Sequence, residues 1–223
     1  MKVLLFGASG MVGQGVLREC LLDPDVELVV SVGRSVTGQH HPKLREIVQP
    51  SLLELDPIKT DLTGYDACFY CLGVSSAGMS EEKYTSITYD LTMVVAGTLL
   101  GLNRNMTFIY VSGMSTDSSE QGRIMWARVK GRTENALLRH RFKDVYMFRP
   151  GAIIPLHGIK SKTGWYNALY FVLKPLFPVL RSLSPGNVTT TEQVGRAMLA
   201  VAKQGYPKKI LEGIDISAKG RSA

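Results

Sequence analysis

The chain has 223 residues, of which 45% are hydrophobic, and its formal net charge is +7. This length and composition predict a single domain, 1–223, in one globular unit with a full core and a small appended lobe. The positive charges are scattered along the chain, whereas a nucleic-acid-binding protein concentrates them in a tract or on one helix, so we expect no nucleic-acid partner.

The cysteines and histidines predict neither a disulfide framework nor a metal site. Three cysteines, an odd number, fit a reducing compartment. Cys68 and Cys71 lie three residues apart in an apolar strand run, so their side chains point to opposite faces and cannot form a redox pair or a metal clip. None of the four histidines has metal-ligand spacing. The chain leads directly into its first strand without a signal-like segment, and we expect a cytoplasmic protein.

The first stretch reads as strand, tight turn and helix. An apolar run at residues 3–6 is followed by Gly7, Gly10 and Gly13, and then by apolar residues at helical spacing. We expect Gly7 to allow the sharp turn, Gly10 to let a pyrophosphate approach the backbone, and Gly13 to let the helix pack closely on the sheet. The alternative is a glycine-rich connector without a ligand, but the strand before and the helix after favour a dinucleotide site.

The end of the second predicted strand, residues 26–32, bears on the choice of cofactor. In a dinucleotide-binding fold this point faces the adenosine ribose, where an acidic residue would take the 2′-hydroxyl and an arginine can take a 2′-phosphate. The chain has Arg34 and Ser35 there. We therefore predict NADP rather than NAD; the alternative is a surface arginine in a turn.

Strands and helices alternate through the next hundred residues. This alternation predicts an α/β fold with a doubly wound, Rossmann-type parallel sheet and right-handed crossovers. Leu72, Gly73 and Val74 then fall where a strand meets the cofactor edge. The expected strands are 44–49, 67–73, 107–111 and 145–148, the expected helices are 80–102 and 123–141, and a loop with a helical turn covers 56–65.

Beyond Gly151 the pattern changes, which divides the domain into a core, 1–155, and a small C-terminal helical lobe, 156–223. Residues 165–180 are very apolar but are interrupted by Lys174, Pro175 and Pro178, whereas a membrane span needs about twenty largely unbroken apolar residues. This segment could cover a substrate pocket, form a homodimer interface or make a peripheral membrane contact. Thr191 is expected to cap a last helix, and an edge strand is expected at 209–211.

A set of short motifs occurs in a fixed order and carries a family resemblance. They are Gly7-x-x-Gly10-x-x-Gly13, Gly33-Arg34-Ser35, Cys71-Leu72-Gly73, Val111-Ser112-Gly113, Val129-Lys130-Gly131 and Arg149-Pro150-Gly151. With this set the chain resembles the atypical short-chain dehydrogenases/reductases, and is similar to the branch that contains the Tat-interacting proteins and their bacterial relatives.

The resemblance implies a role for each matching residue. Ser112 would hydrogen-bond a substrate carbonyl, and Lys130 would grip the nicotinamide ribose. The other implied contacts are Gly7, Ser9, Gly10, Met11, Val12 and Gly13 with the pyrophosphate, Arg34 and Ser35 with the 2′-phosphate, Leu72, Gly73 and Val74 with the adenosine and ribose side, and Pro150 and Gly151 with the nicotinamide.

One position departs from the family. Its acid is a tyrosine four residues before the lysine, where this chain has Trp126, and an indole N–H cannot give up a proton as a phenol does. Tyr84, Tyr89, Tyr110 or Tyr166 could substitute, or Ser115 could act as a second hydroxyl. Two functions stay open: an NADP-dependent oxidoreductase acting on a small carbonyl or alcohol, and a non-catalytic NADP(H)-binding regulator or redox sensor. A nucleotide-sugar epimerase is less favoured, because little C-terminal sequence is left for a sugar lobe.

Overall fold

The computed structural model describes residues 1–159 and 186–222, and its centre is a seven-stranded, wholly parallel sheet. The strand order is β3-β2-β1-β4-β5-β6-β9, which confirms the predicted doubly wound Rossmann-type fold. The strands are β1 (Lys2–Phe6), β2 (Leu28–Gly33), β3 (Leu44–Val48), β4 (Ala67–Tyr70), β5 (Thr107–Val111), β6 (Asp144–Arg149) and β9 (Ile210–Glu212). A separate parallel pair joins β7 (Ala152–Ile154) to β8 (Val188–Thr190).

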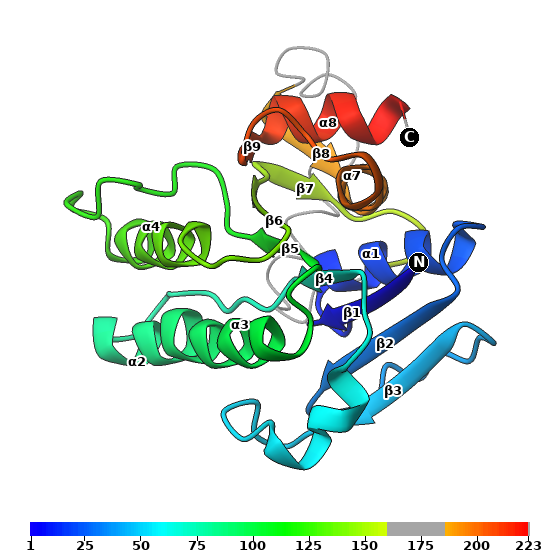
Figure 1. Cartoon of the computed structure of the whole chain (residues 1–223). Coiled ribbons are helices and arrows are strands. Elements are labelled where there is room, and N and C mark those ends of the chain that lie inside the picture. The colour runs from blue at the N-terminus through cyan, green and yellow to red at the C-terminus, as the bar shows by residue number, and fades with distance from the viewer. Residues whose placement is uncertain (160–185, 223) are drawn as a thin grey trace.

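Helices cover both faces of the sheet (Figure 1). One face carries α1 (Met11–Leu22), α7 (Thr191–Gln204) and α8 (Gly213–Ser222), and the other carries α3 (Leu91–Leu102) and α4 (Met125–Leu138). The short α2 (Glu81–Thr85) and the π-helical turn η2 (Ser86–Asp90) run directly into α3, and the 3-10 helix η1 spans Asp56–Leu62. Because both faces are covered, the central strands are continuous apolar runs rather than alternating ones.

Successive residues of the central strands enter two separate cores. In β1, Leu5 belongs to the core under α1 and α7, whereas Leu4 and Phe6 belong to the core under α3 and α4. The same alternation separates the two cysteines, because Cys68 lies in the second core and Cys71 packs against the first. Their predicted orientation to opposite faces is therefore confirmed.

The structure differs from the sequence prediction mainly in the C-terminal part. The edge strand at 209–211 is confirmed as β9, but α8, β7 and β8 were not predicted. The helix α7 has its N-cap at Thr190 rather than Thr191, with a capping box formed with Gln193. Helix α8 contains two glycines, which disfavour a helix in isolation, but a Cβ at Gly220 would lie 2.2 Å from the Gln193 carbonyl oxygen. Close packing against α7 explains this glycine.

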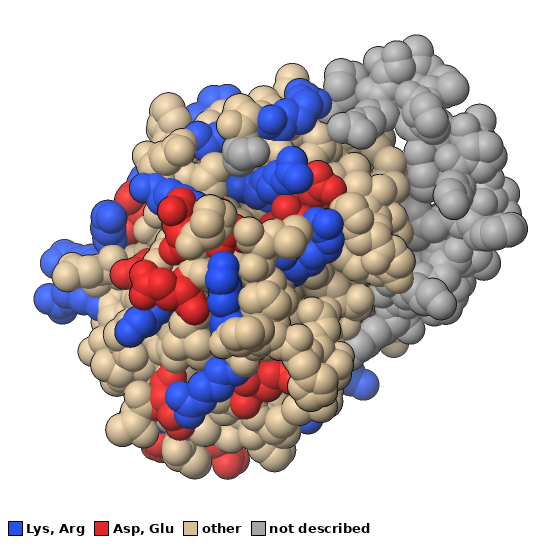
Figure 2. Space-filling model, turned by 90° about the vertical axis from the view of Figure 1, so that its right-hand side faces the viewer, with Lys and Arg blue, Asp and Glu red and all other residues tan. Residues whose placement is uncertain are grey.

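One described helix, Glu81–Leu102, is long and apolar enough to cross a membrane by length and composition, which is weak evidence because core helices of soluble proteins pass the same test. Its buried residues, including Val95 and Leu99, pack under the sheet. The apolar segment 165–180 lies outside the described residues. On the face that Figure 2 shows, basic and acidic side chains are intermixed.

Candidate functional site

Two neighbouring cavities lie along the carboxyl edge of the sheet. The first, which we call the edge cavity, measures about 460 Å³ and is lined by the start of α1 and by residues at or just after the ends of β4, β5 and β6. The second, the β2 cavity, measures about 90 Å³ and lies between the first glycine turn and the end of β2. Leu72 lines both. The strand order reverses between β1 and β4, and that switch point is where open α/β sheets bind their ligands.

Close packing makes two glycines of the first turn necessary. Gly7 has φ +87°, a left-handed conformation, and a Cβ there would lie 2.7 Å from the Cys71 carbonyl carbon. A Cβ at Gly13 would lie 2.0 Å from the Gly7 carbonyl oxygen. Gly10 caps α1, and its N–H donates to the Gly7 carbonyl at 2.9 Å. The three glycines therefore bring the start of α1 directly against the turn after β1.

The N-terminus of α1 is suited to an anion. The helix has no side-chain hydrogen bond at its cap and no acidic residue in its first turn. Met11 and Val12, in that turn, line the edge cavity, and Ser9 lines the β2 cavity. Backbone N–H groups and the helix dipole favour negative charge at this point.

The β2 cavity has one charged lining residue among those described, Arg34, and Ser35 lies beside it. The arginine side chain is exposed. No acidic residue lines this cavity in the described part of the chain. The end of β2 therefore offers a cation, and no carboxylate, to an incoming group.

Lys130 is the charged residue of the edge cavity in the described part of the chain. Its Nζ donates a hydrogen bond to the Ser112 carbonyl oxygen. Burial lowers the pKa of Lys130 to about 8, and the nearby carboxylate of Glu134 partly opposes this shift. Trp126, one helical turn earlier on α4, lines the same cavity. The remaining walls are largely apolar: Met11, Val12, Leu72, Val111, Met114 and Ile153.

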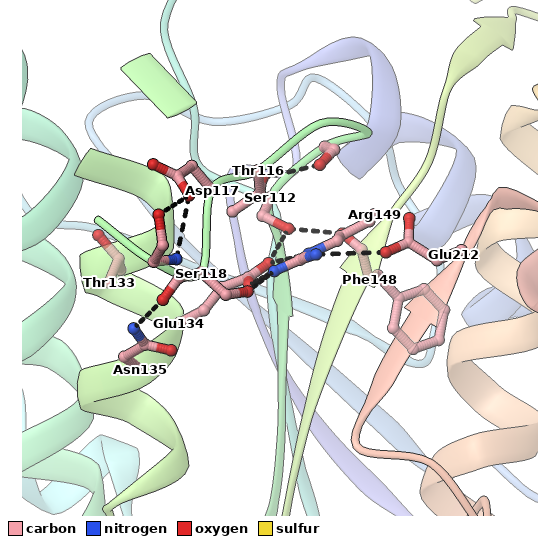
Figure 3. Close-up of polar contacts among 12 residues, drawn as sticks. Ser112, Thr116, Asp117, Ser118, Thr133, Glu134, Asn135, Phe148, Arg149 and Glu212 are labelled. Atoms are coloured by element: carbon pink, nitrogen blue, oxygen red, sulfur yellow. Dashed lines mark hydrogen bonds and ion pairs between the residues drawn. The ribbon is translucent and has the colours of Figure 1, made fainter. Parts of the chain in front are cut away.

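The Ser112 hydroxyl is directed into a buried polar network (Figure 3). Its Oγ lies 2.5 Å from Glu134 Oε1 and 3.1 Å from the Phe148 carbonyl oxygen. A hydroxyl has one proton to donate, and here both neighbouring groups are acceptors. Although Ser112 lines the edge cavity, its proton is held by the protein, which does not fit the expected donation to a substrate carbonyl.

Glu134 and Arg149 form the centre of this network, and sequence reasoning gave neither side chain a role in it. Glu134 is fully buried, and Arg149 Nε lies 3.0 Å and 3.1 Å from its two carboxylate oxygens. Arg149 also reaches Ser118 Oγ at 2.5 Å and Glu212 Oε1 at 3.2 Å. The network joins α4, β6, β9 and the loop after β5. An acidic residue one helical turn after Lys130, with an arginine ending the next strand, is the signal that could have indicated it.

The other predicted residues are placed unevenly. Gly73, Pro150 and Gly151 line the edge cavity, whereas Val74 lines neither cavity and is 39% exposed. Leu72 is the one residue of the 72–74 set that lines both cavities.

The tyrosines considered as substitutes for the missing acid lie elsewhere. Tyr84 and Tyr110 are buried, and burial raises the pKa of both phenols. The Arg132 guanidinium lies over the Tyr89 ring, with its central carbon 4.3 Å from the ring centroid. Tyr166 falls outside the described residues. None of the described tyrosines lines the edge cavity.

No family model matches the chain. It is 25% identical over 159 residues to the mitochondrial protein fmp52 of Emericella nidulans (68% of this chain) and 24% identical over 155 residues to the protein HTATIP2 of Rattus norvegicus (69% of this chain). The matched parts span 66% and 63% of those two proteins, just under two thirds of their lengths.

Among solved structures, the enzyme WbmF of Bordetella bronchiseptica, in complex with NAD+ and UDP, superposes with a TM-score of 0.69 at 18% identity, covering 99% of this chain and 76% of that one. This likeness shows the fold. Together, the fold and the two relatives confirm the predicted resemblance to the atypical short-chain dehydrogenases/reductases, an oxidoreductase-like family of nicotinamide-dinucleotide-binding proteins.

Proposed function

We propose that the protein binds NADP(H) along the carboxyl edge of the sheet and acts as an oxidoreductase on a small carbonyl or alcohol. The observation that carries this proposal is the charge of the two cavities. Arg34 and Lys130 are the charged lining residues of these cavities in the described part of the chain. The N-terminus of α1 borders both cavities, since Met11 and Val12 line the edge cavity and Ser9 lines the β2 cavity. A dinucleotide with a diphosphate and a 2′-phosphate is an elongated anion of matching character.

The residues present fit such a cofactor. The uncapped start of α1 would hold the diphosphate, with Ser9 beside it, and Arg34 and Ser35 would hold the 2′-phosphate. Leu72 and Gly73 would lie against the adenosine and ribose side, while Lys130, Pro150 and Gly151 would lie near the nicotinamide. When bound, the nicotinamide supplies or accepts a hydride. The apolar walls of the edge cavity favour a substrate with a small apolar body beside its carbonyl group.

A second function is favoured by two specific observations. Trp126 stands where the family has its acid, and the Ser112 proton is directed to Glu134. A non-catalytic NADP(H)-dependent regulator or redox sensor would need neither group to serve a substrate.

The two functions are separated by binding and turnover measured on the same preparation. Nucleotide released by heating the purified protein is identified, NADPH and NADH are titrated, and NADPH oxidation is followed against a panel of small carbonyl compounds. Binding with turnover supports the oxidoreductase, and binding without turnover supports the regulator. Failure to bind either dinucleotide refutes both.

A further inference from the structure

The edge cavity contains no acid at the position that the family uses, and this raises the question of which group handles the proton. We propose that the Lys130 ammonium is itself the acid of this site, giving its proton directly to the carbonyl oxygen of the substrate. This inference rests on the proposed oxidoreductase function and assigns its proton donor.

The other lining groups of the cavity are unsuited to the task. The Trp126 indole has no usable acidity. The Ser112 hydroxyl has its one proton directed to Glu134 or the Phe148 carbonyl. Cys71 also lines the cavity, but burial raises the pKa of its thiol far above neutrality. Lys130 is the remaining proton donor on a side chain among the described lining residues.

The geometry leaves the ammonium able to serve a ligand. An ammonium has three N–H bonds, and the hydrogen bond found in the described structure uses one, to the Ser112 carbonyl oxygen. That bond fixes Nζ at the end of β5. A Cβ added to Gly113 would lie 3.9 Å from Nζ, at ordinary contact distance, so the backbone at Gly113 lies directly beside the ammonium. Lys130 and Gly113 both line the cavity.

Burial, opposed only in part by a neighbouring carboxylate, explains why the pKa of this lysine lies nearer neutrality than usual. On α4 itself, Glu134 favours the ammonium, but Arg149 of β6 pairs with that carboxylate. In the loop after β5, Asp117 accepts hydrogen bonds from Ser119 and Gly122. Burial therefore dominates and lowers the pKa of Lys130 to about 8. At pH 7 about nine tenths of such a group carries the proton, and it can still release it readily.

Every proton and electron of the carbonyl reduction is accounted for. An N–H bond of the Lys130 ammonium breaks and an O–H bond forms on the former carbonyl oxygen. The electron pair for the new C–H bond is the hydride of a reduced nicotinamide dinucleotide, which is oxidised. The neutral amine of Lys130 then takes a proton back from water. In the oxidation direction the neutral amine acts as the base, so oxidation should rise with pH where reduction falls.

The first test measures the titration of the Lys130 side chain and does not depend on catalysis. The unliganded protein is pulse-labelled with an acylating reagent at a series of pH values, and the labelled fraction of each lysine is measured by mass spectrometry. We expect the reactivity of Lys130 to rise with a midpoint near pH 8, about two and a half pH units below an ordinary lysine. A midpoint at the ordinary lysine value would overturn the inference, while leaving the proposed function intact.

The second test asks whether Lys130 acts as the acid, by measuring the rate of carbonyl reduction and the NADPH affinity of the variants Lys130→Arg and Lys130→Met. Arginine keeps a cation and N–H donors for a ribose but does not release its proton near neutrality. We expect wild-type kcat/KM for carbonyl reduction to fall tenfold per pH unit above about 8, and Lys130→Arg to lose about 100-fold or more in rate while its NADPH affinity changes little. Lys130→Met should lose both binding strength and rate. Thermal unfolding of each variant controls for folding.

The outcomes separate the inference from the function on which it rests. Lys130→Arg with near wild-type reduction and an unchanged pH profile would overturn the acid role and leave the oxidoreductase standing. Wild-type protein that binds NADPH but reduces no carbonyl would overturn both the acid role and the oxidoreductase. Protein that binds no dinucleotide would overturn the proposed function itself.

Discussion

Replacing Glu134 by alanine tests the buried network behind the edge cavity. The Glu134 carboxylate is fully buried, and the side chain of its ion-pair partner Arg149 is 10% exposed. Glu134→Ala would leave the guanidinium charge in the protein interior without this carboxylate. Removing one partner of a buried ion pair costs about 3–5 kcal/mol. Arg149 keeps its contacts to Glu212 and Ser118, so we expect the low end, about 3 kcal/mol.

This loss is large against the stability of a single domain, which is about 5–15 kcal/mol. Glu134→Gln keeps the shape of the side chain and one oxygen acceptor but removes the charge, and should cost less, about 1–3 kcal/mol. The measurement is the free energy of unfolding from urea titrations followed by circular dichroism and fluorescence, whose coincidence checks that unfolding is two-state.

A more exposed ion pair, between α4 and α2, supplies the control. Arg128 of α4 binds Glu81 at 2.7 Å, with side chains 25% and 49% exposed. Glu81→Ala should cost no more than about 1 kcal/mol. If Glu134→Ala destabilises the protein no more than Glu81→Ala, the network does not hold α4, β6 and β9 together, and the reasoning about Ser112 is refuted with it.

Three further predictions concern the cofactor edge. Arg34→Ala should weaken NADPH binding about tenfold or more in a fluorescence titration and leave NADH binding unchanged; equal losses for both would contradict a 2′-phosphate contact. Gly13→Ala, whose Cβ would meet the Gly7 carbonyl oxygen at 2.0 Å, should lower Tm and dinucleotide affinity, whereas Gly97→Ala, with nothing within 4 Å of its Cβ, should be neutral or stabilising by about 0.5–1 kcal/mol. Trp126→Tyr should raise carbonyl reduction by restoring a phenol beside Lys130; no change in turnover would show that the acid position is not limiting.

The sequence predicted the sheet well because its signals are local. The first turn, for example, combines an apolar strand, glycines at 7, 10 and 13 and an apolar helix. Gly10 and Gly13 pack against the Gly7 carbonyl a few residues away, whereas the close neighbour of Gly7 is the distant Cys71. Strand β5 at Thr107–Val111 has the predicted bounds. Parallel strands that are buried on both faces are recognisable in the sequence as short apolar runs.

The C-terminal lobe and the Ser112 network depend on contacts between distant residues, which local patterns do not carry. Gly213 and Gly220 disfavour a helix in isolation, but their missing Cβ atoms let α8 approach Gly186 and Gln193. Ser112, Glu134 and Arg149 come from three elements and meet only in the folded protein. The sequence could place Ser112 at the cavity but could not show where its proton is directed.

The most direct test of the account is a crystal structure of the protein with NADPH bound. We predict the diphosphate on the N–H groups at the start of α1, the 2′-phosphate on Arg34 and the nicotinamide end beside Lys130. A structure in which this edge stays empty at saturating NADPH, or in which Arg34 turns away from the 2′-phosphate, would contradict it.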